Sequence, residues 1–251
     1  MSLRLVRRAV ALALVLATSI VHFWLLRLRG PRTLERRARW VQYTCKRVLR
    51  SMNIRCETTG PIPTHGLVVA NHLSYLDIVI LSAAMPCFFV AKAEIARWPY
   101  FGKAARTGAT IFIDRKSRAC TVEAARLMSE RLRLPVPVLL FPEGTSTDGS
   151  SVLNFHSALF EPAVAGSTPI TAAAVRYILH DGGSERDLCW FDDALFLPHL
   201  WKVLGVSGFS AEVTFGEPEV YSDRRTAAEA THEEVAAMRA GEHLRLSRLS
   251  P

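Results

Sequence analysis

The chain has 251 residues, of which 49% are hydrophobic and 22% charged, and its formal net charge is +8. This length and composition allow one substantial core, and no internal repeat or low-complexity linker divides the sequence. Residues 1–55 hold 13 Lys or Arg and one Glu, a net charge of +12, whereas residues 56–251 hold 18 basic and 22 acidic residues, a net charge of −4. This distribution excludes a nucleic-acid-binding surface spread over the fold. A basic segment beside an apolar one indicates contact with anionic lipid headgroups.

The first predicted element is an apolar helix over residues 9–26, with arginines on both sides. At 1.5 Å per residue it spans about 27 Å, which is marginal for crossing a hydrocarbon core of ~30 Å. Arg27 and Arg29 follow at once, without the small-residue pattern of a cleavage site, so we expect an uncleaved anchor rather than a signal peptide. Because both flanks are basic, the positive-inside rule fits better if both ends stay on the cytoplasmic face of the membrane.

A second helix is predicted over residues 33–52, where Trp40, Tyr43 and other apolar residues recur among Arg and Lys at helical spacing. This pattern is typical of an amphipathic helix at a membrane interface. The two helices, joined near Gly30, would embed as a hairpin in one leaflet. A single-pass helix followed by a linker is the alternative.

Strand-like and helical patterns alternate along the rest of the chain. The predicted strands are residues 67–70, 88–91, 110–113, 136–141, 170–177 and 211–215. The predicted helices are residues 74–84, 117–131, 157–164 and 224–248, with a short helical region up to residue 105. This alternation predicts an α/β fold with a mostly parallel central sheet flanked by helices.

Two short polar motifs follow predicted strands, where open α/β sheets usually place their ligand sites. Residues 71–77 read Asn-His-Leu-Ser-Tyr-Leu-Asp, and residues 141–147 read Phe-Pro-Glu-Gly-Thr-Ser-Thr. The first motif holds a potential base, His72, and a carboxylate, Asp77. The second holds the carboxylate of Glu143 and a glycine-opened turn beside hydroxyls. Together the two motifs indicate an acyl-transfer site, although either alone would be weak evidence.

Helix geometry limits how His72 and Asp77 can act together. Five residues along a regular helix turn through roughly 500°, which leaves the two side chains about 140° apart. If the helix instead begins near Ser74, His72 lies in the preceding turn and can fold back to Asp77. The imidazole would then accept a proton from a hydroxyl while the carboxylate fixes its tautomer. The alternatives are a helix start in which Asp77 only satisfies backbone donors, and a polar surface histidine.

Four blocks in this order resemble the 1-acylglycerol-3-phosphate acyltransferase family, part of the wider glycerolipid acyltransferase superfamily. They are the His-x4-Asp block at residues 71–77, Gly-Ala-Thr-Ile-Phe-Ile-Asp-Arg at 108–115, Phe-Pro-Glu-Gly-Thr at 141–145, and Thr-Pro-Ile-Thr-Ala at 168–172. The resemblance covers residues 60–220. It implies transfer of a fatty acyl group from a thioester to a hydroxyl of a lysolipid. The chain then divides into an anchor, residues 1–55, and an acyltransferase domain, residues 56–251.

The same resemblance assigns roles to individual residues. His72 is the general base and Asp77 its orienting partner, so no covalent acyl-enzyme is needed. Glu143 fixes polar groups of the acceptor site, and Gly144 allows close approach of the backbone. Arg115 binds an acceptor phosphate through charge-assisted hydrogen bonds, with an ion pair to its neighbour or a solvated strand end as the alternative.

The substrate-binding residues of the third block end in Thr145 and Ser146, where the family's commonest sequence continues from Gly-Thr into Arg. A serine donates one neutral hydrogen bond and lacks the charged, bidentate grip of an arginine on phosphate. We expect 1-acylglycerol-3-phosphate as the acceptor, giving phosphatidic acid. Relatives with a small or hydroxyl residue here acylate lyso-ornithine lipids or lysophospholipids with larger headgroups, which are the alternative acceptors. Arg115 and Lys92 or Lys103 remain available as cations for a phosphate.

No bound cofactor and no metal are expected; the acyl donor is acyl-CoA or acyl carrier protein. The five cysteines are odd in number and lack C-x-x-C spacing, so neither a disulfide framework nor a zinc site is predicted. A serine hydrolase would need Gly-x-Ser-x-Gly, and residues 144–148 fail at the last position. A non-enzymatic membrane adaptor would explain the basic anchor but not the two polar motifs in their order.

Overall fold

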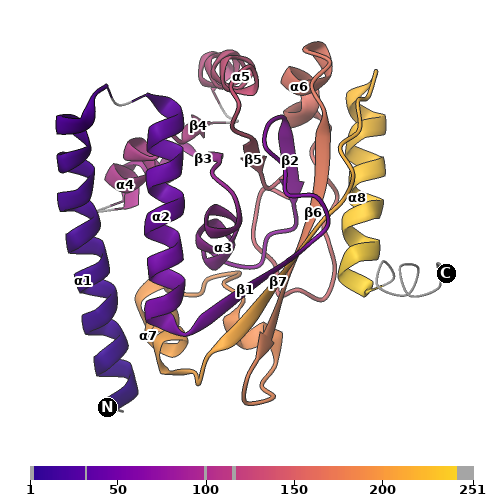
Figure 1. Cartoon of the computed structure of the whole chain (residues 1–251). Coiled ribbons are helices and arrows are strands. Elements are labelled where there is room, and N and C mark those ends of the chain that lie inside the picture. The colour runs from indigo at the N-terminus through magenta and orange to yellow at the C-terminus, as the bar shows by residue number, and fades with distance from the viewer. Residues whose placement is uncertain (1–2, 32, 99–100, 115–116, 242–251) are drawn as a thin grey trace.

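The structure is a computed structural model that describes residues 3–31, 33–98, 101–114 and 117–241 (Figure 1). The helices are α1 (Leu3–Leu25), α2 (Leu34–Met52), α3 (Leu76–Ala84), α4 (Phe101–Thr107), α5 (Arg118–Leu132), α6 (Glu161–Ala165), α7 (Phe196–Gly205) and α8 (Arg224–Ala240). Short 3-10 turns are Leu26–Arg29, Ala93–Arg97, Ser157–Phe160 and Glu185–Leu188. The strands are β1 (Ile54–Thr59), β2 (Leu67–Ala70), β3 (Phe88–Lys92), β4 (Ile111–Ile113), β5 (Val138–Leu140), β6 (Ile170–Leu179) and β7 (Phe209–Phe215).

One seven-stranded sheet organises the described residues, in the order β1-β7-β6-β2-β5-β3-β4. Neighbouring strands are parallel except β6 and β7, which pair antiparallel with Val175 opposite Val213. The predicted mostly parallel α/β sheet is therefore confirmed. All six predicted strands are present, with ends that differ by at most two residues.

Helices cover both faces of the sheet. Alternate residues along the strands enter different cores, because successive side chains of a strand point to opposite faces. Val68 and Leu139 pack with α2, α3 and α7, whereas Val69 and Val138 pack on the other face with α5 and α6. On β6, Ala172 and Ala174 contact α8. The helix α1 lies outside α2, on the edge of the molecule away from α8 (Figure 1).

The seventh strand, β1, is missing from the sequence prediction for a physical reason. Only its first residue, Ile54, is buried, and its polar remainder gives little strand-like patterning. The strand forms because its backbone pairs with β7, from Ile54 opposite Phe209 to Thr59 opposite Thr214. The predicted division between residues 55 and 56 falls inside this strand. The predicted C-terminal helix is present as α8 up to Ala240, and its last residues lie outside the described part of the chain.

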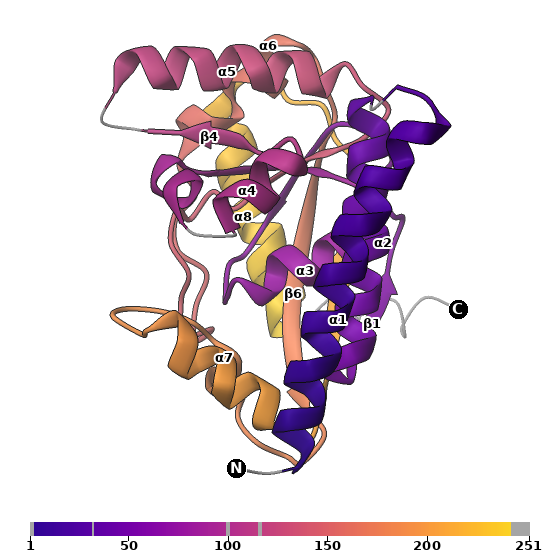
Figure 2. The ribbon, with the colours of Figure 1, turned by 90° about the vertical axis from the view of Figure 1, so that its left-hand side faces the viewer.

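The N-terminal helices α1 and α2 form an antiparallel pair, as the hairpin prediction requires (Figures 1 and 2). Polar contacts join them: the Trp40 indole donates to the Ser19 carbonyl at 3.1 Å, and Arg47 donates to the hydroxyls of Thr18 and Ser19. α1 is 23 residues long, and an 18-residue stretch of it has a mean hydropathy of 1.8 and is only 11% buried. By length and composition this helix is able to cross a membrane.

One buried arginine attaches the start of α1 to the rest of the fold. The guanidinium of Arg8 donates to the carbonyls of Leu204, Val206 and Ser207, with an Nη2 to Ser207 distance of 2.9 Å. These carbonyls lie at the C-terminal end of α7 and just beyond it, where a helix leaves its last acceptors without partners. Arg8 therefore satisfies the end of α7 with a charge-assisted donor set.

We expect Arg8→Gln to lower the free energy of unfolding by about 1.5–3 kcal/mol, because a charged donor to buried carbonyls is lost. Urea unfolding of the detergent-solubilised protein, followed by circular dichroism, measures this change. Arg7→Gln is the matched control, because Arg7 is exposed on the next position of the same helix. Equal stability of the two variants would contradict a structural role for the Arg8 contacts.

Candidate functional site

The site begins at the end of β2, where the backbone leaves the sheet. The Asn71 side chain pairs with the backbone of Val175 on β6, accepting its N–H at 2.8 Å and donating to its carbonyl at 3.1 Å. α3 begins only at Leu76, so His72 lies in the preceding turn, as the helix geometry requires. The clamp at Asn71 fixes where this turn starts.

His72 and Asp77 form the predicted pair. The Nδ1 atom of His72 lies 2.8 Å from Oδ2 of Asp77, whose side chain is fully buried. The same Oδ2 accepts the backbone N–H groups of Leu73 and Ser74 at 2.7 and 2.9 Å. Asp77 thus accepts backbone N–H groups of the turn and also holds the imidazole. Both predicted arrangements, a carboxylate that satisfies backbone donors and a partner that orients His72, are therefore present together. Because a carboxylate only accepts, the ring carries its proton on Nδ1.

The second nitrogen of the imidazole, Nε2, has no hydrogen-bond partner among the described residues. The His72 side chain keeps 18% of its surface exposed. Its ring stacks on Phe141, with centroids 4.1 Å apart and planes 14° from parallel. An oriented ring with an open, unprotonated Nε2 is the form that accepts a proton from a bound hydroxyl.

Tyr177 holds the other oxygen of Asp77, and no sequence motif indicates this role. Its hydroxyl donates to Oδ1 of Asp77 from β6. Burial, with the charge of Asp77, raises the pKa of Tyr177 well above its usual value, so the phenol stays protonated and donates. Both oxygens of Asp77 are therefore occupied, and its carboxylate has little freedom to turn.

A half-buried ion pair between Glu185 and Arg239 supports Tyr177. The Tyr177 N–H donates to Oε1 of Glu185 at 2.7 Å. Arg239, in the last turn of α8, donates to both carboxylate oxygens of Glu185 at 2.9 Å and to the carbonyl of Gly149. These contacts connect the C-terminal helix, through β6, to the His72–Asp77 pair. No local sequence pattern marks them, because all but the Tyr177–Glu185 bond join residues 54 to 100 positions apart.

Glu143 of the second motif locks the His72 turn. Its buried carboxylate accepts the N–H of His72 at 2.7 Å and that of Leu153 at 2.8 Å, one on each oxygen. Burial raises the pKa of Glu143, and these two N–H donors oppose the rise. Gly144 takes a φ of +73°, a left-handed conformation that favours glycine at this turn. The predicted joining of the two motifs is therefore present in the structure.

The remaining predicted acceptor residues lie in different surroundings. Thr145 is exposed, while Ser146 donates its hydroxyl to the carbonyl of Trp190 and so is engaged within the protein. Arg115 lies outside the described residues. Lys92 and Lys103 are both exposed. Within the described part of the chain, no group of three His, Cys, Asp or Glu side chains is placed to hold a metal ion.

Aromatic side chains gather beside the His72 turn. Tyr75 makes edge contacts with Trp190 and Phe196, at centroid distances of 5.8 and 5.0 Å, and its hydroxyl lies 3.0 Å from Nδ1 of His199. Trp98 in turn contacts Trp190 and Phe196. α7 and the loop before it therefore border the site with apolar surface that suits an acyl chain.

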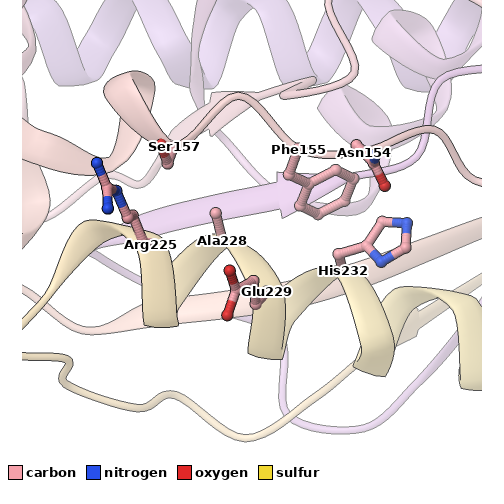
Figure 3. A pocket seen from close by; sticks show the side chains of 7 residues that line it. All are labelled: Asn154, Phe155, Ser157, Arg225, Ala228, Glu229 and His232. Carbon is pink, nitrogen blue, oxygen red and sulfur yellow. The ribbon is translucent and has the colours of Figure 1, made fainter.

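A separate cavity of about 380 Å³ lies between α8 and the loop that follows the second motif (Figure 3). It is lined by Asn154, Phe155, Ser157, Arg225, Ala228, Glu229 and His232. None of these residues belongs to the two motifs, and the Nε2 atom of His232 is engaged with the carbonyl of Val152. This cavity therefore shares no residue with the His72 turn or with the second motif.

The fold and the site together define an α/β protein with a histidine oriented by a buried carboxylate, and comparisons with known proteins give its family. A model of the Acyltransferase family matches residues 53–176. Lyso-ornithine lipid O-acyltransferase of Rhodobacter capsulatus is 37% identical over 206 residues, covering 78% of this chain and 73% of the relative. The enzyme of that name from Brucella abortus is 32% identical and covers 91% of each chain. The chain belongs to the Acyltransferase family.

Other relatives carry a different acceptor in their names. The 1-acyl-sn-glycerol-3-phosphate acyltransferase of Neisseria meningitidis is 35% identical over 185 residues, covering 72% of each chain. The crystal structure of the 1-acyl-sn-glycerophosphate acyltransferase PlsC from Thermotoga maritima superposes with a TM-score of 0.67, covering 97% of this chain and 98% of that one. At 20% identity this likeness shows the shared fold.

We expect Tyr177→Phe to lower kcat about tenfold, the effect of losing roughly 1.4 kcal/mol of one buried hydrogen bond. Without this donor the Asp77 carboxylate interacts more strongly with the imidazolium form of His72. The acid limb of the pH–rate profile should therefore move to higher pH. Steady-state kinetics across pH measure both effects.

Tyr221→Phe is the control for this variant, because Tyr221 lies outside the His72–Asp77 contacts and its phenol interacts with Glu219. An unchanged pH–rate profile in Tyr177→Phe would show that the hydroxyl does not act through Asp77.

Proposed function

We propose that this protein transfers a fatty acyl group from a thioester directly to a hydroxyl of a lysolipid, with His72 as the general base. The observation that carries the proposal is the imidazole held at Nδ1 by a buried carboxylate while Nε2 stays open. The family membership supports acyl transfer as the chemistry.

The proposed reaction has two steps, and His72 takes and returns one proton in them. The acceptor oxygen attacks the thioester carbonyl carbon as its proton passes to Nε2 of His72, and a tetrahedral intermediate forms. The C–S bond then breaks, and the departing sulfur takes the proton from the imidazolium. Asp77 stabilises the imidazolium and keeps the ring oriented. The donor of the acyl group is acyl-CoA or acyl carrier protein, and no bound cofactor takes part.

Ser146 favours lyso-ornithine lipid as the acceptor. Its hydroxyl is neutral and already donates to Trp190, so this position offers a phosphate no charged grip. The names of the Rhodobacter and Brucella relatives support this choice. The second candidate is 1-acylglycerol-3-phosphate, which the family resemblance places first and the Neisseria relative supports. Arg115 would then hold its phosphate.

The membrane provides the acceptor at the site. The long apolar helix α1 and the membrane-lipid substrates in the names of relatives support membrane association. We place the α1–α2 hairpin in one leaflet on the cytoplasmic face, because basic residues flank the apolar stretch at both ends. A lysolipid then reaches His72 sideways from the leaflet, without passing through water.

We expect His72→Ala to lower kcat/KM by about a hundredfold to ten-thousandfold, the usual contribution of a general base. Binding to phospholipid vesicles, measured by flotation, should be unchanged. His65→Ala is the matched control, since His65 is exposed and outside both motifs. Full acyl-transfer activity in His72→Ala would contradict the assignment of His72 as the base. Absence of any acyl transfer by the wild-type protein would favour a non-enzymatic membrane adaptor.

We expect lyso-ornithine lipid to be acylated faster than 1-acylglycerol-3-phosphate in an acceptor panel with one labelled thioester. Ser146→Arg should raise kcat/KM for the phosphate acceptor relative to lyso-ornithine lipid by about tenfold, because a guanidinium adds a charge-assisted contact. Ser146→Ala separates this gain from loss of the Trp190 bond. A wild-type preference for 1-acylglycerol-3-phosphate would reverse our order of acceptors.

A further inference from the structure

A second cavity, of about 500 Å³, lies at the open end of the α1–α2 hairpin. It is enclosed by the first turns of α1, the last residues of α2 and the loop between α7 and β7, and it is lined by Leu3, Arg4, Arg7, Arg8, Ala11, Arg50, Ser51, Asn53 and Ser207. None of these residues belongs to the two catalytic motifs. We call it the arginine pocket.

All the charged residues that line the arginine pocket are cationic. The lining contains four arginines and no Asp or Glu. One carboxylate outside the lining, that of Asp181, accepts a hydrogen bond from the hydroxyl of the lining residue Ser207. The one acid of residues 1–55, Glu35, lies in the first turn of α2, at the other end of the hairpin. Like charges three and four positions apart on α1 repel each other without a local partner.

The arginines of the pocket differ in what they contact. Arg8 is buried on the carbonyls beyond α7 and forms part of the wall. Asn53 donates to Ser207 at 3.0 Å and closes the same corner. Arg4, Arg7 and Arg50 are exposed, and no ion pair of the described residues includes them. Their guanidinium groups therefore remain available to bind an anion, in a cavity whose wall is already held by the contacts of Arg8 and Asn53.

The surroundings identify the kind of anion. Guanidinium groups bind phosphate oxygens in a planar, bidentate manner. Leu3 and Ala11 add apolar surface to the same cavity. Beside it, Val6, Val10 and Leu14 expose the apolar side of α1, which is the surface we place in the leaflet. An amphiphile fits this combination, with its phosphate among the arginines and its chains along α1.

We propose that the arginine pocket binds the phosphate of one anionic phospholipid, at a site separate from the acyl-transfer centre. The proposal rests on the membrane placement of α1 described above. Bound there, the lipid neutralises the repulsion among the arginines. It also holds the hairpin at the depth of the headgroups, next to the contacts of Arg8 with α7.

The test compares two double variants that each remove two exposed positive charges from the hairpin. Arg4→Gln/Arg7→Gln alters the pocket and leaves Arg8 in place. Arg39→Gln/Lys46→Gln is the matched control, on exposed positions of α2 outside the pocket. Thermal unfolding in detergent verifies that both variants fold as the wild type does.

Native mass spectrometry with phosphatidylglycerol should show a one-to-one lipid adduct in the wild type and in the control, and none in the pocket variant. On mixed phosphatidylcholine and phosphatidylglycerol vesicles, removing two positive charges should weaken binding by about thirtyfold through the loss of diffuse attraction alone. The affinity of the pocket variant for these vesicles should fall at least about tenfold further than that of the control, because the pocket variant also loses a specific phosphate contact. Equal losses in the two variants, or an adduct that persists in the pocket variant, would overturn the site.

Inorganic phosphate is the second probe. It should not displace the lipid at comparable concentration, because it lacks the chains that contact α1. Displacement would assign the pocket to free phosphate and overturn the lipid assignment. Both readouts are independent of turnover, so a failure of this proposal is distinct from a failure of acyl transfer, which the His72 variant tests.

Discussion

The buried carboxylate of Asp77 is the interaction on which the rest of the site depends. A carboxylate removed from water is costly unless its oxygens are satisfied, and here four donors satisfy them. Two are backbone N–H groups of the His72 turn, one is the imidazole and one is the Tyr177 hydroxyl. Three of these contacts hold the turn and the ring in place. The carboxylate of Asp77, whose negative charge favours a protonated imidazole, therefore also holds the turn that carries His72.

The sequence predicts the parts of this site that are close along the chain. His72 and Asp77 are five residues apart, so helix geometry alone limits their arrangement to a turn before α3. Tyr177 and Arg239 escape prediction because their roles depend on the register of β6 and the docking of α8. β1 escapes because its stability comes from pairing with β7 rather than from its own apolar pattern. Local chemistry is readable in the sequence, whereas support from distant elements is a tertiary property.

The second motif acts mainly through the first. Glu143 accepts the N–H of His72 on one carboxylate oxygen and that of Leu153 on the other. It thereby holds His72 in position, and substrate contact by Glu143 and its neighbours stays a prediction. Ser146 donates to the carbonyl of Trp190, whose backbone N–H donates to the carbonyl of Leu73 at 2.8 Å. The loop before α7 is thereby tied to both motifs, so the acceptor selectivity that we propose for residue 146 would depend on the position of that loop.

The anchor and the enzyme are joined more closely than a tether requires. Val48, Leu49 and Met52 of α2 belong to the core beneath α3, and Arg8 of α1 completes the end of α7. Figure 2 shows α1 and α7 on the same side of the molecule. α7 in turn touches Tyr75 in the His72 turn through Phe196. Because packed elements transmit displacement rather than absorb it, the proposed depth of α1 in a leaflet would also set the position of α7 beside His72. In that placement, the contacts of α1 with the rest of the fold would hold a membrane-borne acceptor and the imidazole in a fixed arrangement.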